Sequence, residues 1–479
     1  MVTPPRPRFR PRRDDLRAMA RLALPVVLVQ VGLMTMGTAD TIMVGHLSGP
    51  ALAAVALGNL YFFAVVIFGQ GALMALDPLV AQAVGARDAA AVARALQRGL
   101  LLAGLLALPL ALLLLPAGAV FDRLGQPGEI VPIAAAYARV SAVGVPPFLA
   151  FIVLRQTLQA LGRLRPVVVT IVLANLANVA ANWVLIYGHL GAPPMGAVGS
   201  AWATVASRWL MGLGLAALAW PALRPALRPL RREVLEAAPL ARMLRLGAPI
   251  GAQLQLEFGA FGAIGVLMGW LGAREMAGHQ VALNLASLTF MVPLGISGAA
   301  AVLVGQAVGA GDDARARRAA GAALALATAF MALSALAFLT APHLLARIYA
   351  TDPVVVAIAA LLLPIAGLFQ LFDGWQVVSI GVLRGVGDTR APMILNVLGF
   401  YAIGLPVSAL LGFRVGAGPR GLWWGLVVGL GVVALLLLAR VRRRLGRGLR
   451  RLAVEAPGRD LPSAAPSPTP PRDRAARRA

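Results

Sequence analysis

The sequence has no cysteine and few charged residues, and each shortage excludes a class of protein. Without cysteine the chain forms no disulfide, no catalytic thiolate and no Cys-ligated metal site, and its four histidines leave little for zinc. Charged residues are 13% of the chain and hydrophobic residues 59%, with a mean hydropathy of +0.81. A chain of 479 residues with this composition is too apolar for a water-soluble globule. The composition therefore predicts a polytopic membrane protein.

Acidic residues are also scarce, since 19 of them face 43 basic ones and leave a formal net charge of +24. Such an excess is compatible with nucleic-acid binding, but the arginines cluster at the ends of apolar runs. That placement is typical of a protein held against anionic lipid headgroups. We therefore expect membrane lipids as partners and no nucleic acid.

Twelve apolar segments follow one another along the chain, and their lengths and hydropathy predict an all-α membrane protein of about twelve transmembrane helices. They cover approximately residues 22–44, 52–76, 100–121, 133–158, 166–187, 197–219, 246–271, 278–304, 319–339, 354–383, 391–413 and 421–438.

The segments and the charged stretches between them divide the chain into five parts. We expect a basic arm at residues 1–21, an N-lobe of helices 1–6 at 22–220, an inter-lobe loop at 221–245, a C-lobe of helices 7–12 at 246–440 and a basic, disordered tail at 441–479. Threading twelve segments puts most Arg-rich loops on one side, which the positive-inside rule assigns to the cytoplasm. Both termini and the inter-lobe loop are therefore predicted to be cytoplasmic.

An internal repeat relates the two halves. VAQAVGARDAAAVARA, which begins at Val80, aligns without a gap with VGQAVGAGDDARARRA, which begins at Val304. The same offset relates Pro25 to Pro249. An even number of helices per half gives both lobes the same orientation, so a pseudo-two-fold axis along the membrane normal relates them. In such proteins the substrate site usually lies between the halves, and rocking of the lobes gives alternating access.

Three carboxylates lie inside the apolar segments: Asp40, Glu257 and Asp373. An ionisable side chain at bilayer depth costs about 2.5 to 3.5 kcal/mol on insertion scales, so it is rare without a partner or a function. We interpret these acids as the ion-handling part of a transporter. The alternative is that they are structural acids hydrogen-bonded to polar neighbours.

Several motifs carry a resemblance to a known family: MGTADTIMVGHL, PLVAQAVGA, NVAANWVLIYG, AGHQVALNLASLTFMVPLGISGAAAVLVGQAVGAG and DGWQVVSIGVLRGVGDTRAPM. From residue 22 to about 438 the chain resembles the multidrug and toxic compound extrusion (MATE) family, particularly its NorM-like bacterial branch. The resemblance implies a two-lobe antiporter of the inner membrane that exports cationic or amphipathic compounds in exchange for H⁺ or Na⁺. It implies neither an enzyme nor a cofactor, and we expect a monomer.

The resemblance also assigns coupling residues. Asp40 falls at the family's first-helix acid, and Asn178 and Asn182 fall in the facing fifth helix. The two asparagines are spaced i, i+4, so both amides point from one helix face toward a neighbouring carboxylate. A plain interhelical polar clamp is the alternative interpretation of this group.

Glu257 and Asp373 match the family's second-lobe acids, in the first and fourth helices of that lobe. Two anions in one low-dielectric cavity repel, so at least one should hold a proton, or the pair should hold a metal cation. No metal site is firmly assigned, although Na⁺ suits the coupling residues. Phe369, one turn before Asp373, offers no oxygen to Na⁺ and favours H⁺. A structural hydrogen-bonded role is again the alternative.

The remaining polar residues receive structural interpretations. His279 is a secondary candidate that titrates near neutral pH, but a lone histidine is more often a packed, hydrogen-bonded residue. Asp77, which precedes Pro78, departs from the uncharged residue usual there and is expected to be solvated near a helix end. Arg155 and Arg384 are expected to snorkel to headgroups.

A lipid-linked precursor flippase and a membrane-embedded enzyme are the two alternative functions. A lipid-linked precursor flippase of the same superfamily would line its cavity with arginine for pyrophosphate, whereas the charges within these segments are mainly acidic. A membrane-embedded enzyme would need a His/Asp, Ser/His or metal-ligand constellation, and the sequence contains none at usable spacing.

Overall fold

The computed structural model describes residues 9–452 and contains only helices and connecting segments in this range. Eleven helices are long and apolar enough to cross a membrane. A twelfth span is formed by two helices, Val131–Ala142 and Val145–Ala160, which meet at a bend of 50°. The prediction of an all-α protein with about twelve spans is therefore confirmed.

The N-lobe holds the first six spans. Its elements are α1 (Arg13–Gly45), α2 (Gly49–Leu73), α3 (Leu76–Gly85), α4 (Ala89–Leu114), α5 (Ala117–Arg123), α6 (Val131–Ala142), α7 (Val145–Ala160), α8 (Arg165–Tyr187), α9 (Gly196–Trp209), the π-helix η1 (Leu210–Gly214) and α10 (Leu215–Leu218). The helix α11 (Trp220–Leu227) and the 3₁₀ turn η2 (Arg232–Leu235) lead to the C-lobe.

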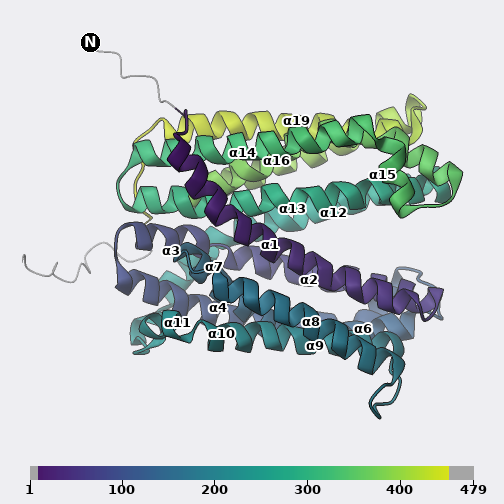
Figure 1. The fold of residues 1–479 in the computed structure, drawn as a ribbon, viewed down its shortest axis with the longest axis horizontal. Helices are drawn as coiled ribbons and strands as arrows, with labels where there is room; N and C mark the ends of the chain where they lie inside the picture. Colours follow the sequence, from purple (N-terminus) through teal and green to yellow (C-terminus); the bar gives the residue numbers. More distant parts are fainter. Residues whose placement is uncertain (1–8, 453–479) are drawn as a thin grey trace, which may run out of the picture.

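The C-lobe holds the other six spans. Its elements are α12 (Ala237–Leu271), α13 (Ala273–Gly309), α14 (Asp313–Thr340), α15 (Pro342–Tyr349), α16 (Pro353–Gly385), α17 (Arg390–Asn396), the π-helix η3 (Val397–Gly404), α18 (Leu405–Ala409), the π-helix η4 (Leu410–Arg414) and α19 (Gly418–Leu445). Figure 1 shows the two lobes as two stacked bundles whose long helices run in the same general direction.

The repeat in the sequence appears in the structure as matched helix starts. Asp88 caps α4 by accepting a hydrogen bond from the Ala91 N–H at 2.9 Å, and Asp312 caps α14 by accepting one from the Arg315 N–H at 2.8 Å. Aspartate at this position satisfies an N–H group that the helix itself leaves unpaired. The two caps are separated by the same offset as the repeated motif, so both lobes begin their third span in the same way.

The first helix of each lobe packs against the other lobe. In Figure 1, α1 crosses diagonally from the upper bundle to the lower one. Near its start Met19 is fully buried in a C-lobe core, and Asp15 forms an ion pair with Arg318 of α14 at 3.2 Å. In the same way α12 packs against α2, where a Cβ on Gly71 would lie 2.5 Å from Gly251 Cα. Glycine at this position allows the two backbones to touch.

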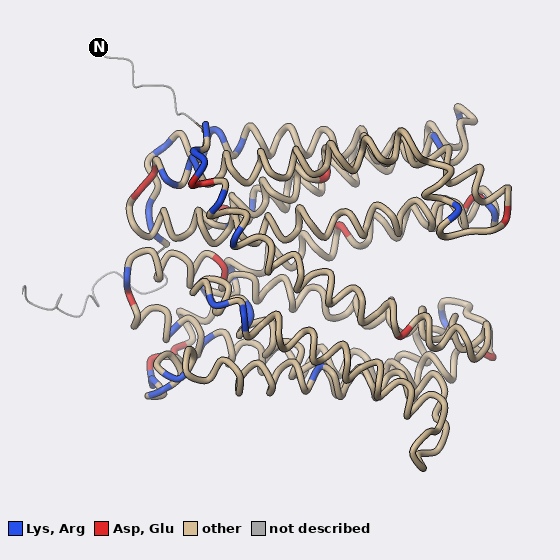
Figure 2. The backbone as a smooth tube through the Cα atoms, in the orientation of Figure 1, with Lys and Arg blue, Asp and Glu red and all other residues tan. Residues whose placement is uncertain are grey.

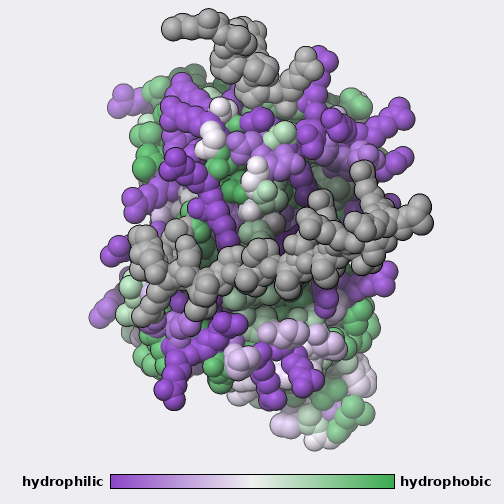
Figure 3. All heavy atoms as spheres, turned by 90° about the vertical axis from the view of Figure 1, so that its left-hand side faces the viewer, coloured by the Kyte–Doolittle hydropathy of each residue, from purple (hydrophilic) through white to green (hydrophobic). Residues whose placement is uncertain are grey.

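Arginine gathers at the end of the molecule that carries residues 9 and 452, which we call the basic end (Figure 2). Viewed from that side, hydrophilic side chains ring the surface and hydrophobic ones lie at its margins (Figure 3). This asymmetry is the one that the positive-inside argument uses.

Some predicted boundaries shift in the structure. The basic arm predicted for residues 1–21 is already helical from Arg13, and α19 continues to Leu445 inside the stretch predicted as a disordered tail. Beyond it, the Leu452 N–H donates to the Gln82 Oε1 of α3 at 2.8 Å, so the first part of the tail is packed. Residues 1–8 and the tail from residue 453 to 479 lie outside the described residues.

Candidate functional site

Asp40 of α1 is the centre of a buried polar cluster in the N-lobe. Its side chain is 1% exposed, and its two oxygens accept hydrogen bonds of 2.6 Å each, from Asn182 Nδ2 and Thr204 Oγ1. Asn182 Nδ2 also donates to Asn178 Oδ1 at 3.2 Å, one turn earlier on α8. The structure therefore brings the three predicted N-lobe residues together.

Two members of this cluster were not predicted from the sequence. Thr204 and Arg208 lie one turn apart on α9, and Arg208 is 7% exposed although it lies within a membrane span. The charges of Arg208 and Asp40 act on each other. The criterion that selected the buried acids, an ionisable group inside an apolar segment, would have selected Arg208 as well.

Glu257 and Asp373 form the corresponding cluster in the C-lobe. Asp373 of α16 is 7% exposed, Glu257 of α12 is half-buried, and their charges act on each other. The side-chain amides of Gln253, one turn earlier on α12, and of Gln376 on α16 lie close enough to act on Glu257. The structure thus brings the two predicted acids together and surrounds them with amides.

Further polar groups of the C-lobe form a separate chain one turn from Asp373. Gln370 of α16 donates to Thr289 Oγ1 at 2.7 Å and accepts from Ser334 Oγ at 2.6 Å. This chain joins α13, α14 and α16 without using either acid. No single-helix pattern indicated it, because its members come from three spans.

His279, the secondary candidate, lies apart from both clusters. It is 1% exposed on α13, and its Nδ1 accepts a hydrogen bond of 3.2 Å from Trp423 Nε1. The ring of Phe369 packs edge-on against the same tryptophan, with centroids 5.8 Å apart. His279 therefore has the packed, hydrogen-bonded setting that the sequence analysis gave as its commoner role.

The structure contradicts the sequence-based interpretation of Asp77, Arg155 and Arg384. Asp77 is 1% exposed and forms an ion pair of 3.0 Å with Arg384 Nε, while Arg155 is close enough for its charge to act on both. Asp77 and Arg155 belong to α3 and α7 of the N-lobe and Arg384 to α16 of the C-lobe. The prediction of a solvated Asp77 and two snorkelling arginines was wrong because packing between lobes buries these helix ends.

Two matched hydrogen bonds also join the lobes. Gln82 Nε2 of α3 donates to the Gly385 carbonyl, and Gln306 Nε2 of α13 donates to the Ala160 carbonyl, both at 2.9 Å. Each glutamine is the repeat partner of the other. These two hydrogen bonds lie near helix ends at the basic end, as do the ion pairs Asp77–Arg384 and Asp15–Arg318.

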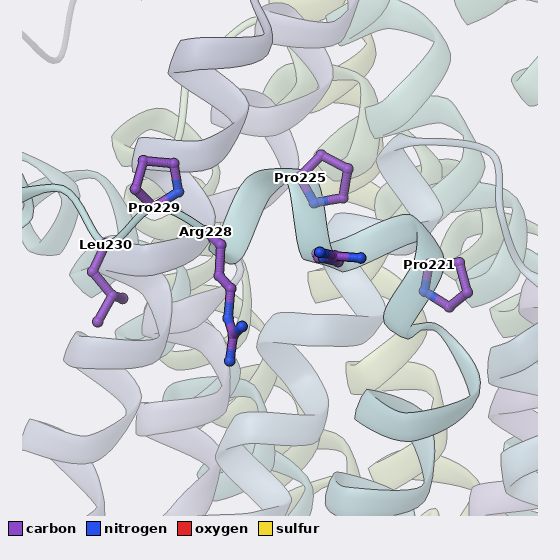
Figure 4. A pocket seen from close by; sticks show the side chains of 6 residues that line it. Pro221, Pro225, Arg228, Pro229 and Leu230 are labelled. Carbon is purple, nitrogen blue, oxygen red and sulfur yellow. The ribbon is translucent and has the colours of Figure 1, made fainter.

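A hollow of about 970 Å³ opens on the surface of the basic end (Figure 4). It is lined by Pro221, Arg224, Pro225, Arg228, Pro229 and Leu230, all from α11 and the segment that follows it. Arg228 lies over the Trp220 ring, with 5.6 Å from its guanidinium carbon to the ring centroid. This hollow contains none of the buried acids.

The side chains available as metal ligands limit which ions the protein could bind. Residues 9–452 contain no group of three or more His, Cys, Asp or Glu side chains that could hold a metal ion. A transition-metal site needs such a set, whereas Na⁺ needs only several oxygens. Each cluster offers carboxylate oxygens with amide or hydroxyl oxygens beside them.

Comparison with known proteins decides the family. A family model described as MatE matches the chain at residues 25–184 and again at 249–410, once in each lobe and over more than half of the chain. The chain belongs to the MatE family. Its predicted membership is thereby confirmed, and with it the prediction that the protein is a transporter and not an enzyme.

Similar proteins cover almost the whole MatE chain. A probable multidrug resistance protein NorM from Mesorhizobium japonicum is 39% identical over 90% of this chain and 94% of its own length. The multidrug resistance protein PmpM from Pseudomonas aeruginosa is 37% identical over 92% and 94%.

Solved structures share the fold of this MatE chain. The eukaryotic MATE transporter AtDTX14 superposes with a TM-score of 0.82 at 23% identity, covering 90% of this chain and 98% of that one. A multidrug resistance MATE transporter of the MOP superfamily, described in an outward-facing conformation, gives 0.81 at 22% identity over 90% and 96%. The two-lobe architecture is therefore shared across distant members.

Proposed function

We propose that this chain is a secondary active multidrug efflux antiporter of the inner membrane. It exports cationic or amphipathic small molecules in exchange for H⁺ or Na⁺, with both termini in the cytoplasm. Relatives named as multidrug resistance proteins support the efflux. The strongest support for ion exchange is the pairing of Glu257 with Asp373 inside one lobe of a membrane protein.

The physical reason is electrostatic. Two carboxylates that share a low-dielectric cavity cannot both stay ionised cheaply, so the site attracts a positive charge. A proton or an alkali cation supplies that charge, and so does a cationic substrate. The acids therefore hold either the coupling ion or the substrate, and uptake of one releases the other. Asp40 with Asn178 and Asn182 forms a second candidate coupling cluster, in the N-lobe.

The driving force that one coupling ion supplies depends on the charge of the substrate. A monovalent coupling ion that enters under 100 mV gains about 2.3 kcal/mol, and a tenfold concentration gradient adds about 1.4 kcal/mol. The total of about 3.7 kcal/mol sustains a gradient of roughly 500-fold for a neutral substrate. For a monovalent cationic substrate exchanged one for one, the charges cancel and only the tenfold gradient drives export. Coupling to one ion therefore favours neutral compounds at high potential.

The conformational step is a rocking of the lobes about their interface. The contacts between lobes, including the Asp77–Arg384 ion pair, gather near the basic end. With that end in the cytoplasm, the structure corresponds to a state closed to the cytoplasm. Loading of the coupling ion from outside would then favour separation of these contacts and opening inward.

Transport in liposomes tests this function. Purified protein is reconstituted with a cationic fluorescent dye, and dye movement is followed under an imposed pH gradient and, separately, an imposed Na⁺ gradient. We expect one gradient to accelerate dye transport, and Glu257→Gln and Asp373→Asn to abolish that acceleration. Dye transport that ignores both gradients in the wild-type protein would reject the antiporter.

A further inference from the structure

A short segment that follows the last helix crosses the interface between the lobes at the basic end. We call residues 446–452 the strap; it begins directly after α19, which belongs to the C-lobe and ends at Leu445. The strap itself contains no helix. Its other end contacts α3 and the start of α4 in the N-lobe. The chain thus leaves one lobe and is fastened to the other.

The first half of the strap is fixed to the C-lobe. Arg317 Nη1 of α14 donates to the Leu445 carbonyl at 3.2 Å, and the Leu449 N–H donates to Asp313 Oδ2 of the same helix at 3.5 Å. The side chain of Leu449 is partly buried and packs against the hydrophobic core of the C-lobe. We therefore expect this half of the strap to move with the C-lobe.

The second half of the strap is fixed to the N-lobe. Arg451 Nη2 forms an ion pair of 2.9 Å with Asp88 Oδ2, the aspartate that caps α4. The Leu452 N–H donates to Gln82 Oε1 of α3 at 2.8 Å, while Gln82 Nε2 donates to the Gly385 carbonyl of the C-lobe. Both ends of this one amide therefore hold chain that comes from the other lobe.

Leu452 lies at the seam between the lobes. Its side chain is next to Gly387, in the turn between α16 and α17 of the C-lobe, where a Cβ would lie 2.6 Å from Leu452 Cδ2. The turn holds Gly387 at a φ of +79°, a left-handed conformation that favours glycine. Glycine thus permits the turn and leaves the space that Leu452 occupies. One residue of the strap therefore contacts both lobes.

The strap has little slack between its two attachments. Only three residue steps separate Leu449, which is bonded to the C-lobe, from Leu452, which is bonded to the N-lobe. A fully extended chain spans at most about 3.6 Å per residue, so these steps reach about 11 Å. A wider separation of the attached groups must break one attachment. The strap therefore opposes parting of the lobes at the basic end.

We propose that the strap is a latch that holds the basic end closed and must release Asp88 and Gln82 before the lobes part there. This inference rests on the rocking of the lobes proposed above. The strap contacts with the N-lobe exist only in the closed state, so they stabilise that state relative to the open one. The Arg451–Asp88 pair is 38% and 31% exposed, which makes it a weak ion pair that releases readily. The latch thus sets the population of the open state and does not lock the protein.

Thiol labelling measures this opening. The chain has no cysteine, so Val302→Cys supplies a single thiol. Val302 lies on α13 of the C-lobe, is 1% exposed and packs in a hydrophobic core of the N-lobe. It lies one turn before Gln306 and does not contact the strap. A water-soluble maleimide reaches this thiol when the lobes part, so the labelling rate follows the population of the open state.

Two truncations separate the strap from the residues that follow it. Removal of residues 447–479 should raise the labelling rate about tenfold, because one ion pair and one hydrogen bond to the N-lobe are lost. Removal of residues 453–479 leaves the strap intact and should keep the rate within about twofold of the full chain. Equal rates in the two truncated proteins would overturn the latch.

A pair of point variants tests the ion pair without shortening the chain. Arg451→Gln should raise the labelling rate about two- to fivefold, since it removes the partner of Asp88. Arg450→Gln is the matched control: it removes the same charge one residue earlier, from an exposed side chain that has no hydrogen bond or ion pair within residues 9–452. It should leave the rate unchanged. An equal response of the two variants would make net charge the cause and would refute the latch.

A second reporter separates opening from loss of the fold. Ala103→Cys places the thiol on α4, which packs against N-lobe helices, at a position that is 3% exposed. Removal of residues 447–479 should leave labelling at this position unchanged. Faster labelling at positions 103 and 302 alike would show that the strap stabilises the whole fold, and the latch would be rejected.

The latch and the antiporter fail separately. If dye transport ignores both imposed gradients while removal of residues 447–479 still accelerates labelling at position 302, the antiport function is rejected and the latch stands. If transport responds to a gradient and both truncated proteins are labelled at the rate of the full chain, the antiporter stands and the latch is rejected.

Discussion

Replacing Asp77 by asparagine removes the acid of the charge cluster that joins the two lobes at the basic end. Asp77 pairs with Arg384 across the interface at 3.0 Å, and the two side chains are only 2% and 7% exposed. Arg155 lies close enough for its charge to act on both. After the change two buried cations face each other without a counter-charge.

The size of the effect follows from this burial. Removing one partner of a buried ion pair costs about 3 to 5 kcal/mol, because the other charge stays uncompensated. When the basic end opens, water hydrates both arginines and the cost disappears. The mutation therefore destabilises only the closed state. The equilibrium between closed and open should therefore shift toward open by roughly a hundredfold to several thousandfold.

Spin-label distances measure this shift directly. The chain has no cysteine, so cysteines introduced at Arg163 of the N-lobe and Arg315 of the C-lobe carry the two labels at defined positions. Both positions are exposed near the basic end. We expect a distance distribution that moves to longer values in Asp77→Asn, together with slower gradient-driven transport because the closed state is reached less often.

An ion pair within one lobe provides the control. Asp388 pairs with Arg440 at 2.8 Å inside the C-lobe, and Arg440 is 46% exposed. Exposed pairs contribute about 0.2 to 1 kcal/mol, so Asp388→Asn should leave the distances unchanged. Unaltered distances and transport in Asp77→Asn would refute a role of the pair in closing this end.

Three further predictions concern packing and pH. Gly251→Leu should push α12 from α2 and lower the melting temperature in detergent, since overpacking costs about 1 to 3 kcal/mol, whereas Gly262→Ala, where a Cβ meets nothing within 4 Å, should not. Burial acts to raise the pKa of Asp88, but the Ala91 N–H and Arg451 outweigh it and lower this pKa below 3.8. The Arg451 contact should therefore persist at every pH above about 4 and weaken only as the pH falls through the lowered value, so protease sensitivity of the Arg451 segment that rises between pH 8 and pH 5 would contradict this. Replacing His279 by glutamine should leave the pH dependence of transport unchanged; a shifted profile would give His279 a functional role.

The spans and lobes were accessible from the sequence because the bilayer dictates them. Each membrane-spanning segment must pair its backbone N–H and C=O groups within itself, so it appears in the sequence as a long apolar helix. The motif repeated at Val80 and Val304 indicated the division into two lobes. The 50° bend before Val145 was not visible, since hydropathy records length and polarity but no direction. Extension of α1 back to Arg13 was missed because its first turns are polar and pack against the other lobe.

The site was predictable where one helix or one spacing carried the signal. Asp40 and Asp373 stood out as acids in apolar runs, and the i, i+4 spacing of Asn178 and Asn182 placed both on one face. Thr204, which donates to Asp40, comes from another span and had no signal of its own. Asp77 was misjudged for a related reason: a helix end next to water in one lobe is buried when the second lobe packs onto it.

Ion movement driven by substrate alone tests the central claim most directly. Liposomes that contain the protein and a luminal pH or Na⁺ indicator receive a gradient of a cationic substrate, with no ion gradient imposed. The account predicts that one of the two ions moves opposite to the substrate in the wild-type protein and that Asp373→Asn abolishes this movement. Substrate transport without counter-movement of either ion, or equal ion movement in Asp373→Asn, would contradict it.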